Sequence, residues 1–228
     1  MRVDQIWRYP VKSLGGEPLT AATVDTLGIE GDRVIAVRDE KRDEITWAGG
    51  VPGLMRVRAV TVAPGVAELI PPDGERFRSD APDAGRRLSA VVDADVTLVG
   101  YQSDRPYAAL HVLTTTTLRN LGSALPDSTV DVTRFPPNLV LDANSDGIQS
   151  GYPELDWVGR RMSIGTLRLR FTEACDRCAA ITRETVTAPR DRAVLRFVAR
   201  ELGNAVGVYA EVETPGHIRV GDEARWLD

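Results

Sequence analysis

Residues 166–171 read TLRLRF, and the alternation of side chains in this stretch decides the fold class. Leu167, Leu169 and Phe171 recur at period two, with an arginine between each pair. Because successive side chains of a strand point to opposite faces, this pattern predicts a strand with its apolar residues inward and its arginines outward.

The first hundred residues contain similar short runs of strand-forming residues. In residues 3–9, VDQIWRY, we expect Val3, Trp7 and Tyr9 to share one face of a strand. Glycine, proline and aspartate turn signals bound the other runs. Strands this short, broken this regularly, indicate a small barrel or sandwich. The other predicted strands lie at 32–40, within 59–78 (divided by turns at Pro64-Gly65 and Asp73-Gly74) and at 95–101.

Beyond about residue 103 the pattern becomes mixed. Residues 115–122, TTTLRNLG, predict a short helix with a threonine cap and a glycine at its end. Residues 188–204 predict a longer helix, in which Val194, Val198 and Leu202 follow the spacing i, i+4, i+8. The other predicted elements are a helix at 82–92, strands at 138–142 and 166–171, and a terminal strand pair within 218–228. We therefore predict a β-rich α+β fold with a boundary near residue 103.

The composition is that of an ordinary globular protein, with 43% hydrophobic and 27% charged residues in 228. A chain of this length can bury a core as one large domain or as two small ones. The formal net charge of −5 argues against a nucleic-acid partner, because neutralising phosphates needs a basic surface. Local arginine clusters could still bind one small anion.

The first ten residues, MRVDQIWRYP, contain no apolar h-region, and no apolar run approaches the ~20 residues of a membrane helix. We therefore expect no signal peptide, no membrane partner and a cytoplasmic location. In that reducing compartment the two cysteines of the chain are expected to be thiols.

The stretch TEACDRCAAITRE contains both cysteines, Cys175 and Cys178. A zinc site is disfavoured, because only His111 and His217 remain as further Cys/His ligands and neither has paired spacing. A thioredoxin-like dithiol is favoured where a helix follows the second cysteine. The residues that follow Cys178, AAITRETV, lack helical spacing, and this weakens the interpretation. Two further interpretations stay open. One is a single thiolate, flanked by Arg177, that serves as a soft metal ligand, and the other is two buried cysteines without a role.

Three other stretches carry groups that suit an anionic ligand. YPVKSLGG places Lys12 and Ser13 before a Gly-Gly turn, which lets backbone approach a ligand closely. GIEGDR places Arg33 at the entry to a strand, and TRFPPN holds Arg134 and Asn138 around a rigid Pro-Pro. Each stretch also has a purely structural explanation, such as an exposed lysine, a solvated arginine or a proline corner. Together with one thiol, these groups would suit a ligand that is both anionic and metal-bearing.

The motifs occur in the order YPVKS, GDR, RFPPNLVLD, ACDRCAAIT and PGHIRVGDEARWL. In this order they resemble those of MOSC-domain proteins. Over essentially its whole length the chain is similar to the branch that includes the mitochondrial amidoxime-reducing component and its bacterial relatives. The resemblance implies a MOSC N-terminal β-barrel domain at residues 1–103, followed by a mixed β-barrel MOSC domain with short helices at residues 104–228.

The resemblance also implies a cofactor. Family members bind molybdenum cofactor, a pterin that holds the metal through a dithiolene and carries a terminal phosphate, and a protein cysteine ligates the molybdenum. Cys178 matches that ligand, and a thiolate suits such a metal. Cys175 matches a position with no ligand role. The positions that match the other cofactor contacts are Lys12, Ser13, Arg33, Arg134, Asn138 and Arg177.

Related enzymes reduce small N-hydroxylated compounds, such as amidoximes and hydroxylamines, to amidines and amines. By this resemblance the chain would be a molybdenum-dependent oxidoreductase, with Cys178 as its catalytic metal ligand. Electrons would come from a separate flavin or iron–sulfur protein, because the chain has no further cysteines for a cluster. Two alternatives stay open: a module that binds or carries the cofactor or transfers sulfur without reductase activity, and a cofactor-free thiol protein.

Three positions depart from these relatives. Where relatives often read Asp-Thr, the nearest residues here are Pro106-Tyr107 in RPYAALHVL, so we expect the acidic group near the metal to be absent. The loop TWAGGVPGL offers Trp47, Ala48 and two glycines where relatives tend to carry a basic or amide residue. Asp176 stands between the cysteines, where a small hydroxyl residue is usual in the mitochondrial proteins. A carboxylate there would oppose a nearby anion.

Overall fold

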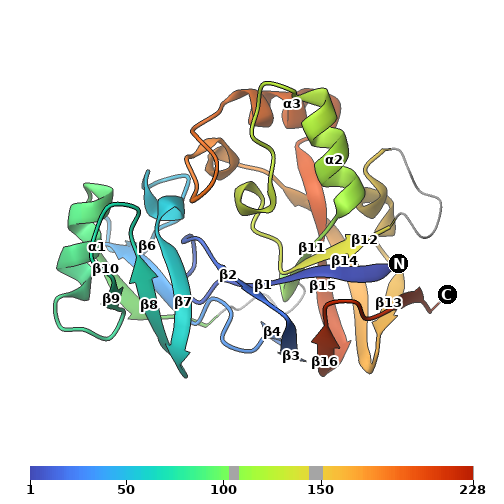
Figure 1. Ribbon diagram of the computed structural model, residues 1–228, viewed down its shortest axis with the longest axis horizontal. Coiled ribbons are helices and arrows are strands. Elements are labelled where there is room, and N and C mark those ends of the chain that lie inside the picture. The colour runs from blue at the N-terminus through green and yellow to red at the C-terminus, as the bar shows by residue number, and fades with distance from the viewer. Residues whose placement is uncertain (103–107, 144–150, 228) are drawn as a thin grey trace.

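A mixed sheet of eight strands organises the described part of the computed structural model, which comprises residues 1–102, 108–143 and 151–227. In spatial order its strands are β17 (Ala224–Trp226), β13 (Arg161–Ile164), β14 (Leu167–Asp176), β15 (Ala205–Thr214), β11 (Leu110–Thr114), β12 (Leu139–Asp142), β1 (Arg2–Arg8) and β2 (Glu17–Leu19). Only β11 and β12 pair in parallel; the other neighbours are antiparallel. Figure 1 shows both chain ends at one side of this sheet.

Three sheets of three strands are also present in the described ranges. Two of them belong to the N-terminal hundred residues, and the third joins a strand near the C-terminus to two strands near the N-terminus. Their strands, in spatial order, are β10 (Val96–Gly100), β5 (Ile35–Asp39) and β6 (Glu44–Ile45); β7 (Arg58–Ala63), β8 (Val66–Ile70) and β9 (Phe77–Arg78); and β16 (Gly216–Arg219), β3 (Ala21–Asp25) and β4 (Gly28–Ile29).

Helices are few and short, so the β-rich α+β prediction is confirmed. In Figure 1, α1 lies beside the small N-terminal sheets, whereas α2 and α3 lie together above the large sheet. Within the described ranges no helix combines the length and the apolar character needed to cross a bilayer. The helices are α1 (Ala84–Val92), α2 (Thr115–Ala124) and α3 (Ala193–Glu201), with 3₁₀ turns η1 (Leu54–Arg56), η3 (Val132–Arg134), η5 (Pro153–Trp157) and η6 (Ala179–Thr182).

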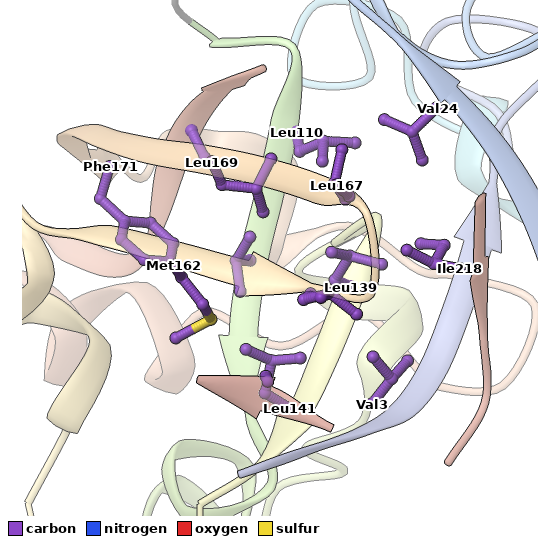
Figure 2. Packing of buried hydrophobic residues seen from close by; sticks show 14 of the residues in the cluster. Val3, Val24, Leu110, Leu139, Leu141, Met162, Leu167, Leu169, Phe171 and Ile218 are labelled. Atoms are coloured by element: carbon purple, nitrogen blue, oxygen red, sulfur yellow. The ribbon is translucent and has the colours of Figure 1, made fainter. Parts of the chain in front are cut away.

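Strand β14 has the alternation that its sequence predicts. Leu167, Leu169 and Phe171 are buried, and the two arginines between them are exposed. Figure 2 shows these three side chains converging with those of neighbouring strands on one apolar core. On the outer face Arg170 makes an ion pair at 2.6 Å with Glu211, its partner across β15. Burial of one face and ion pairing on the other fix the register of this central strand.

Strand β1 corrects the predicted face of the N-terminal run. Val3 and Ile6 enter the core, whereas Trp7 is only half-buried and stacks on Tyr9 with ring centroids 6.4 Å apart. The register to β12 shifts between Val3 and Gln5, which marks a β-bulge. An extra residue in a strand reverses which side chains face the core, so Val3 does not share the face of Trp7 and Tyr9.

Among the predicted helix ends, the threonine cap of α2 agrees with the structure, whereas the end expected at a glycine does not. The Thr114 hydroxyl accepts from the amide of Thr117 at 3.0 Å and caps α2, but the helix continues past Gly122 to Ala124. Helix α3 begins at Ala193, later than predicted. The terminal strand pair is wrong as a pair, because β16 joins β3 and β17 joins β13.

Two main cores divide the chain unevenly. The core of the large sheet takes Val3, Ile6 and Val24 from the first thirty residues and packs them against residues beyond 108. A second core, which includes Leu54 and Leu88, is built from residues between 11 and 98 alone. The first strands therefore complete the C-terminal half of the molecule. The boundary predicted at residues 103–104 and the departure at Pro106-Tyr107 lie outside the described residues and stay predictions.

Candidate functional site

Two adjoining cavities lie where the N-terminal loops meet the segment after β14. The first has a volume of about 250 Å³ and is lined by residues from three segments, 9–14, 47–55 and 175–181, together with Arg33 and others. The second has a volume of about 320 Å³. The second volume lies at the lower end of the range of about 300–1,000 Å³ that is typical of small-molecule sites, and the first lies just below it. The two share the lining residues Lys12, Arg33, Pro136, Arg177 and Tyr209, and so form one continuous cleft.

Every predicted site residue lines this cleft. Six of them border the first cavity, and Asn138 borders the second. The sequence motifs, which are up to 166 positions apart, are thus brought together by the fold. Their side chains nevertheless differ in whether their polar atoms are free or already bonded within the protein. The six at the first cavity are Lys12, Ser13, Arg33, Arg134, Arg177 and Cys178.

The two cysteines have different environments. Both are free thiols and both border the first cavity, but Cys178 is exposed whereas Cys175 is buried. Cys178 immediately precedes η6, and the antiparallel strand β14 ends just before it, at Asp176. Beside Cys175 lies Tyr209, whose pKa is raised by burial and then by that thiol. A thiol that faces a cavity can bind a ligand, and a buried one is expected to serve packing.

Arg177 points away from solvent into the protein. Its Nε donates to the Val206 carbonyl at 2.8 Å, and Nη1 donates to the Phe135 carbonyl at 3.3 Å. Its Nη2 donates to Nε2 of His111 at 2.6 Å and also to the Val206 carbonyl. The guanidinium is thus held by backbone on two sides, so its position is fixed before any ligand binds.

Lys12 and Ser13 present polar groups that are not paired with a carboxylate in the described part of the chain. The ammonium of Lys12 donates to the Tyr101 hydroxyl at 3.5 Å and lies 4.7 Å from the centroid of that ring. Ser13 adopts the left-handed conformation with φ of 74°, and neither its amide nor its hydroxyl has a partner in the described part of the chain. A lysine charge beside an unpaired amide and hydroxyl is an arrangement that suits an anion.

The guanidinium of Arg33 is partly bonded within the protein and partly exposed to the cleft. Its guanidinium pairs with Asp32, donates to Oδ1 of Asn138 at 3.2 Å and lies 5.0 Å from the ring centroid of Tyr9. The side chain is still 30% exposed and borders both cavities. The residue has a φ of 50°, which places it at the turn before β5 as its sequence indicates.

Arg134 is completely buried, and its guanidinium is used by the protein itself. Nε donates to the Thr129 carbonyl at 3.0 Å, Nη1 to the Ile181 and Arg183 carbonyls at 2.9 and 3.4 Å, and Nη2 to the Pro189 carbonyl at 2.9 Å. Burial lowers its pKa. Three of these carbonyls belong to the segment that follows Cys178, so Arg134 positions that segment.

Asn138 joins three strands. Its Oδ1 accepts from the His111 amide at 3.2 Å, and its Nδ2 donates to the Trp7 carbonyl at 3.3 Å. These bonds tie β12 to β11 and β1, and the same Oδ1 accepts a hydrogen bond from Arg33. The side chain is almost fully buried, and its contacts position the floor of the second cavity.

Several cavity residues have no counterpart among the predicted ones. Tyr9 and Tyr209 line the first cavity, and Trp47, a residue that is 45% exposed, borders it. His111 borders the second cavity and holds Arg177. Tyr9 directly precedes the Pro-Val-Lys-Ser motif, which is a signal that could have found it. Trp47 belongs to the loop TWAGGVPGL, which the sequence already marks as a departure from relatives. For Tyr209 and His111 the sequence carries no local signal, because their contacts come from distant strands.

Side chains of the described residues do not form a metal site by themselves. Among residues 1–102, 108–143 and 151–227, no group of three or more His, Cys, Asp or Glu residues is placed to hold a metal ion. His217 lies on β16, where it contacts Thr23, and His111 is engaged by Arg177. Zinc held by the two cysteines and two histidines therefore has no support. A metal at Cys178 would have to arrive with other ligands of its own.

Two family models match the chain: MOSC N-terminal beta barrel domain at residues 1–104, and MOSC domain at residues 101–225. The crystal structure of the YUAD protein from Bacillus subtilis is similar, with a TM-score of 0.51 and 13% identity over 98% of this chain and 93% of that one. This likeness concerns the fold alone. The crystal structure of YiiM from Geobacillus stearothermophilus has a TM-score of 0.39 and 13% identity over 59% of this chain and 64% of that one. No curated protein matches the sequence.

Proposed function

Because this chain belongs to the family of proteins that combine an N-terminal MOSC β-barrel domain with a MOSC domain, we propose that it binds molybdenum cofactor beside Cys178 and reduces N-hydroxylated compounds. MOSC domains are associated with molybdenum cofactor binding. The observation that carries the proposal is one exposed thiol on a cavity that is also lined by several cations.

The residues of the cleft fit the chemistry of such a group. A metal bound in a dithiolene brings sulfur ligands with it, so the protein needs to add only one soft ligand, and Cys178 offers a free thiol. A phosphate and a polar pterin edge need cations and amide or hydroxyl groups. Lys12, Ser13 and Arg33 supply these, with groups that are unpaired or partly exposed.

Arg134, Arg177 and Asn138 take a different part in this proposal. Their polar atoms are largely bonded to backbone carbonyls and to His111. We assign them as positioning residues that hold the segment around Cys178 and the turn at Arg33. Such support fixes binding groups in place and limits the entropy lost when a ligand is bound.

When bound, the cofactor would supply the two-electron redox chemistry. Reduction of an amidoxime to an amidine consumes two electrons and two protons and releases one water. The protein would bind the substrate in the cavity next to Cys178, where Asp176 is the one carboxyl group among the described lining residues. We propose that a separate flavin or iron–sulfur protein delivers the electrons, because both cysteines of the chain lie at this site.

The test is turnover by the cofactor-loaded protein. Purified holoprotein with a chemical electron donor should convert an amidoxime to the amidine, and Cys178→Ala should abolish this activity. Cys175→Ala is the matched control, because it removes the neighbouring thiol, which is buried; it should keep most of the activity. Equal losses in both variants would instead indicate a dithiol protein.

A different result would indicate that the protein is a cofactor carrier and not a reductase. If the wild-type holoprotein holds molybdenum tightly but turns over no N-hydroxylated compound, the reductase proposal fails. Transfer of the cofactor from this protein to an apo-enzyme would then identify it as a binding or delivery module.

A further inference from the structure

One wall of the first cavity is apolar and aromatic. Trp47 contributes a large, partly exposed indole, and Ala48, Met55 and Ile181 continue the same wall as buried side chains. These residues border the first cavity and not the second. Cys178 likewise borders only the first cavity. The thiol therefore lies on the side of the cleft that carries the apolar wall.

The cations are shared between the two cavities. Lys12, Arg33 and Arg177 border both, Arg134 borders the first, and the second adds the polar side chains of Tyr101, His111 and Asn138. An anionic cofactor group would be attracted to these cations. A substrate that approaches Cys178 would also meet the apolar wall, because that wall borders the same cavity as the thiol.

The indole of Trp47 is held against its own loop and the segment after Cys178. A Cβ added to Gly49 would lie 2.5 Å from Nε1 of Trp47 and 2.9 Å from its Cδ1, so the indole packs directly over this glycine. The Gly49 carbonyl accepts a hydrogen bond from Nη2 of Arg183, and the same Cβ would be 3.5 Å from the Ala180 amide. The loop is thereby fixed to residues only two to five positions beyond Cys178.

We propose that Trp47 determines specificity by forming an aromatic wall beside Cys178. This wall favours substrates whose N-hydroxylated group is attached to a planar aryl ring over those that carry a small alkyl group. The inference rests on the proposed function. Its physical cause is the favourable packing of an aryl ring on an indole, which adds contact area and an aromatic interaction that a methyl group cannot make.

The test separates binding from turnover. Without an electron donor no reduction takes place, so equilibrium binding of benzamidoxime and of acetamidoxime to the holoprotein can be measured by calorimetry. Trp47→Ala should weaken benzamidoxime binding by about tenfold and change acetamidoxime binding by less than about twofold. Trp47→Phe should retain most of the preference. Because Trp47 is partly exposed, none of these variants is expected to unfold the protein.

A second variant displaces the indole without removing it. Gly49→Ala introduces the clash with Trp47 described above and should reduce the preference for the aryl compound in the same direction. Gly50→Ala is its matched control, because a Cβ there would lie 3.7 Å from the indole Cε3, an ordinary contact, and its closest neighbour would be Oγ1 of Thr46 at 3.3 Å, which is tight but does not involve the indole. Leu27→Ala removes an apolar residue of similar exposure that lines neither cavity. Both controls should keep the wild-type preference.

The outcomes distinguish this inference from the proposed function. Unchanged benzamidoxime binding in Trp47→Ala, equal weakening of both compounds, or no binding of either to the wild type would overturn the aromatic wall. If Trp47 sets the preference but the holoprotein with a donor turns over neither compound, the wall stands and the reductase proposal fails.

Discussion

The side chains of Arg177 and His111 are in direct contact, with Nη2 of the arginine 2.6 Å from Nε2 of the histidine. Because a guanidinium can only donate, Nε2 must be the unprotonated nitrogen. The proton then resides on Nδ1, which lies 3.4 Å from the Pro136 carbonyl and donates to it. Burial, and then the charge of Arg177, hold the pKa of His111 well below its ordinary value. A neutral histidine thus holds the arginine that precedes Cys178.

This contact predicts a loss of stability in mild acid. The pKa of His111 is lowered in the folded state, so below about pH 6.5 the unfolded chain binds a proton that the folded chain does not. The free energy of unfolding should therefore fall by about 1 kcal/mol between pH 7.5 and 5.5 from this group. His111→Gln keeps an acceptor for Arg177 but cannot titrate, and should lose less. Urea unfolding at both pH values measures the difference.

His217 is the matched control, because it is the other histidine of the chain and is exposed. His217→Gln should keep the pH dependence of the wild type. If His111→Gln and the wild type lose the same free energy on acidification, the neutral His111–Arg177 pair is not the cause.

Arg134 and Lys12 should separate stability from cofactor retention. Arg134→Lys leaves several backbone carbonyls around a buried site without donors and should lower the free energy of unfolding by about 3 kcal/mol.

Lys12→Ala removes a partly exposed cation. It should lower the free energy of unfolding by less than about 1 kcal/mol, but it should reduce the molybdenum retained after gel filtration. Chemical unfolding and elemental analysis check the two effects. Loss of stability in Lys12→Ala with full retention of the metal would reverse the assigned roles.

Glu154 predicts a pH effect of opposite sign. Its Oε2 accepts from the hydroxyls of Thr114 and Thr117 at 2.8 and 2.6 Å, while Oε1 has no partner among the described residues. Burial raises the pKa of this carboxyl, so the folded state loses stability as pH rises above the unfolded value of about 4.3. Relative to the wild type, Glu154→Gln should gain about 1 kcal/mol on going from pH 5 to pH 8.

Thermal unfolding at the two pH values tests this expectation. Glu75→Gln provides the control, because that side chain is 94% exposed and should show no such gain. A gain of the same size in both variants would attribute the effect to net charge and not to burial of Glu154.

Local patterns predicted the elements whose signals are local. The alternation at Leu167, Leu169 and Phe171 gave a buried strand face, and the hydroxyl at Thr114 capped a helix, because each depends on residues a few positions away. The face of β1 was predicted wrongly, since the bulge after Val3 depends on pairing with β12 about 140 positions later. The partners of β16 and β17 were missed for the same reason.

The candidate site shows the same division. The order of the sequence motifs predicted that Lys12, Arg33 and Cys178 belong to one binding site, and in the structure all three line one cleft. The sequence could not show that the Arg134 guanidinium points into backbone carbonyls, nor that His111 meets Arg177. That meeting needs space on β15, where Gly207 has a φ of 80° and any Cβ would collide with the imidazole.

The account depends most on one bond, between the Cys178 thiolate and molybdenum. X-ray absorption at the molybdenum K-edge counts the sulfur ligands of the metal in cofactor-loaded protein. We predict that Cys178→Ser has one sulfur ligand fewer than the wild type, whereas Cys175→Ser has the same number. An unchanged sulfur count in Cys178→Ser would contradict the account.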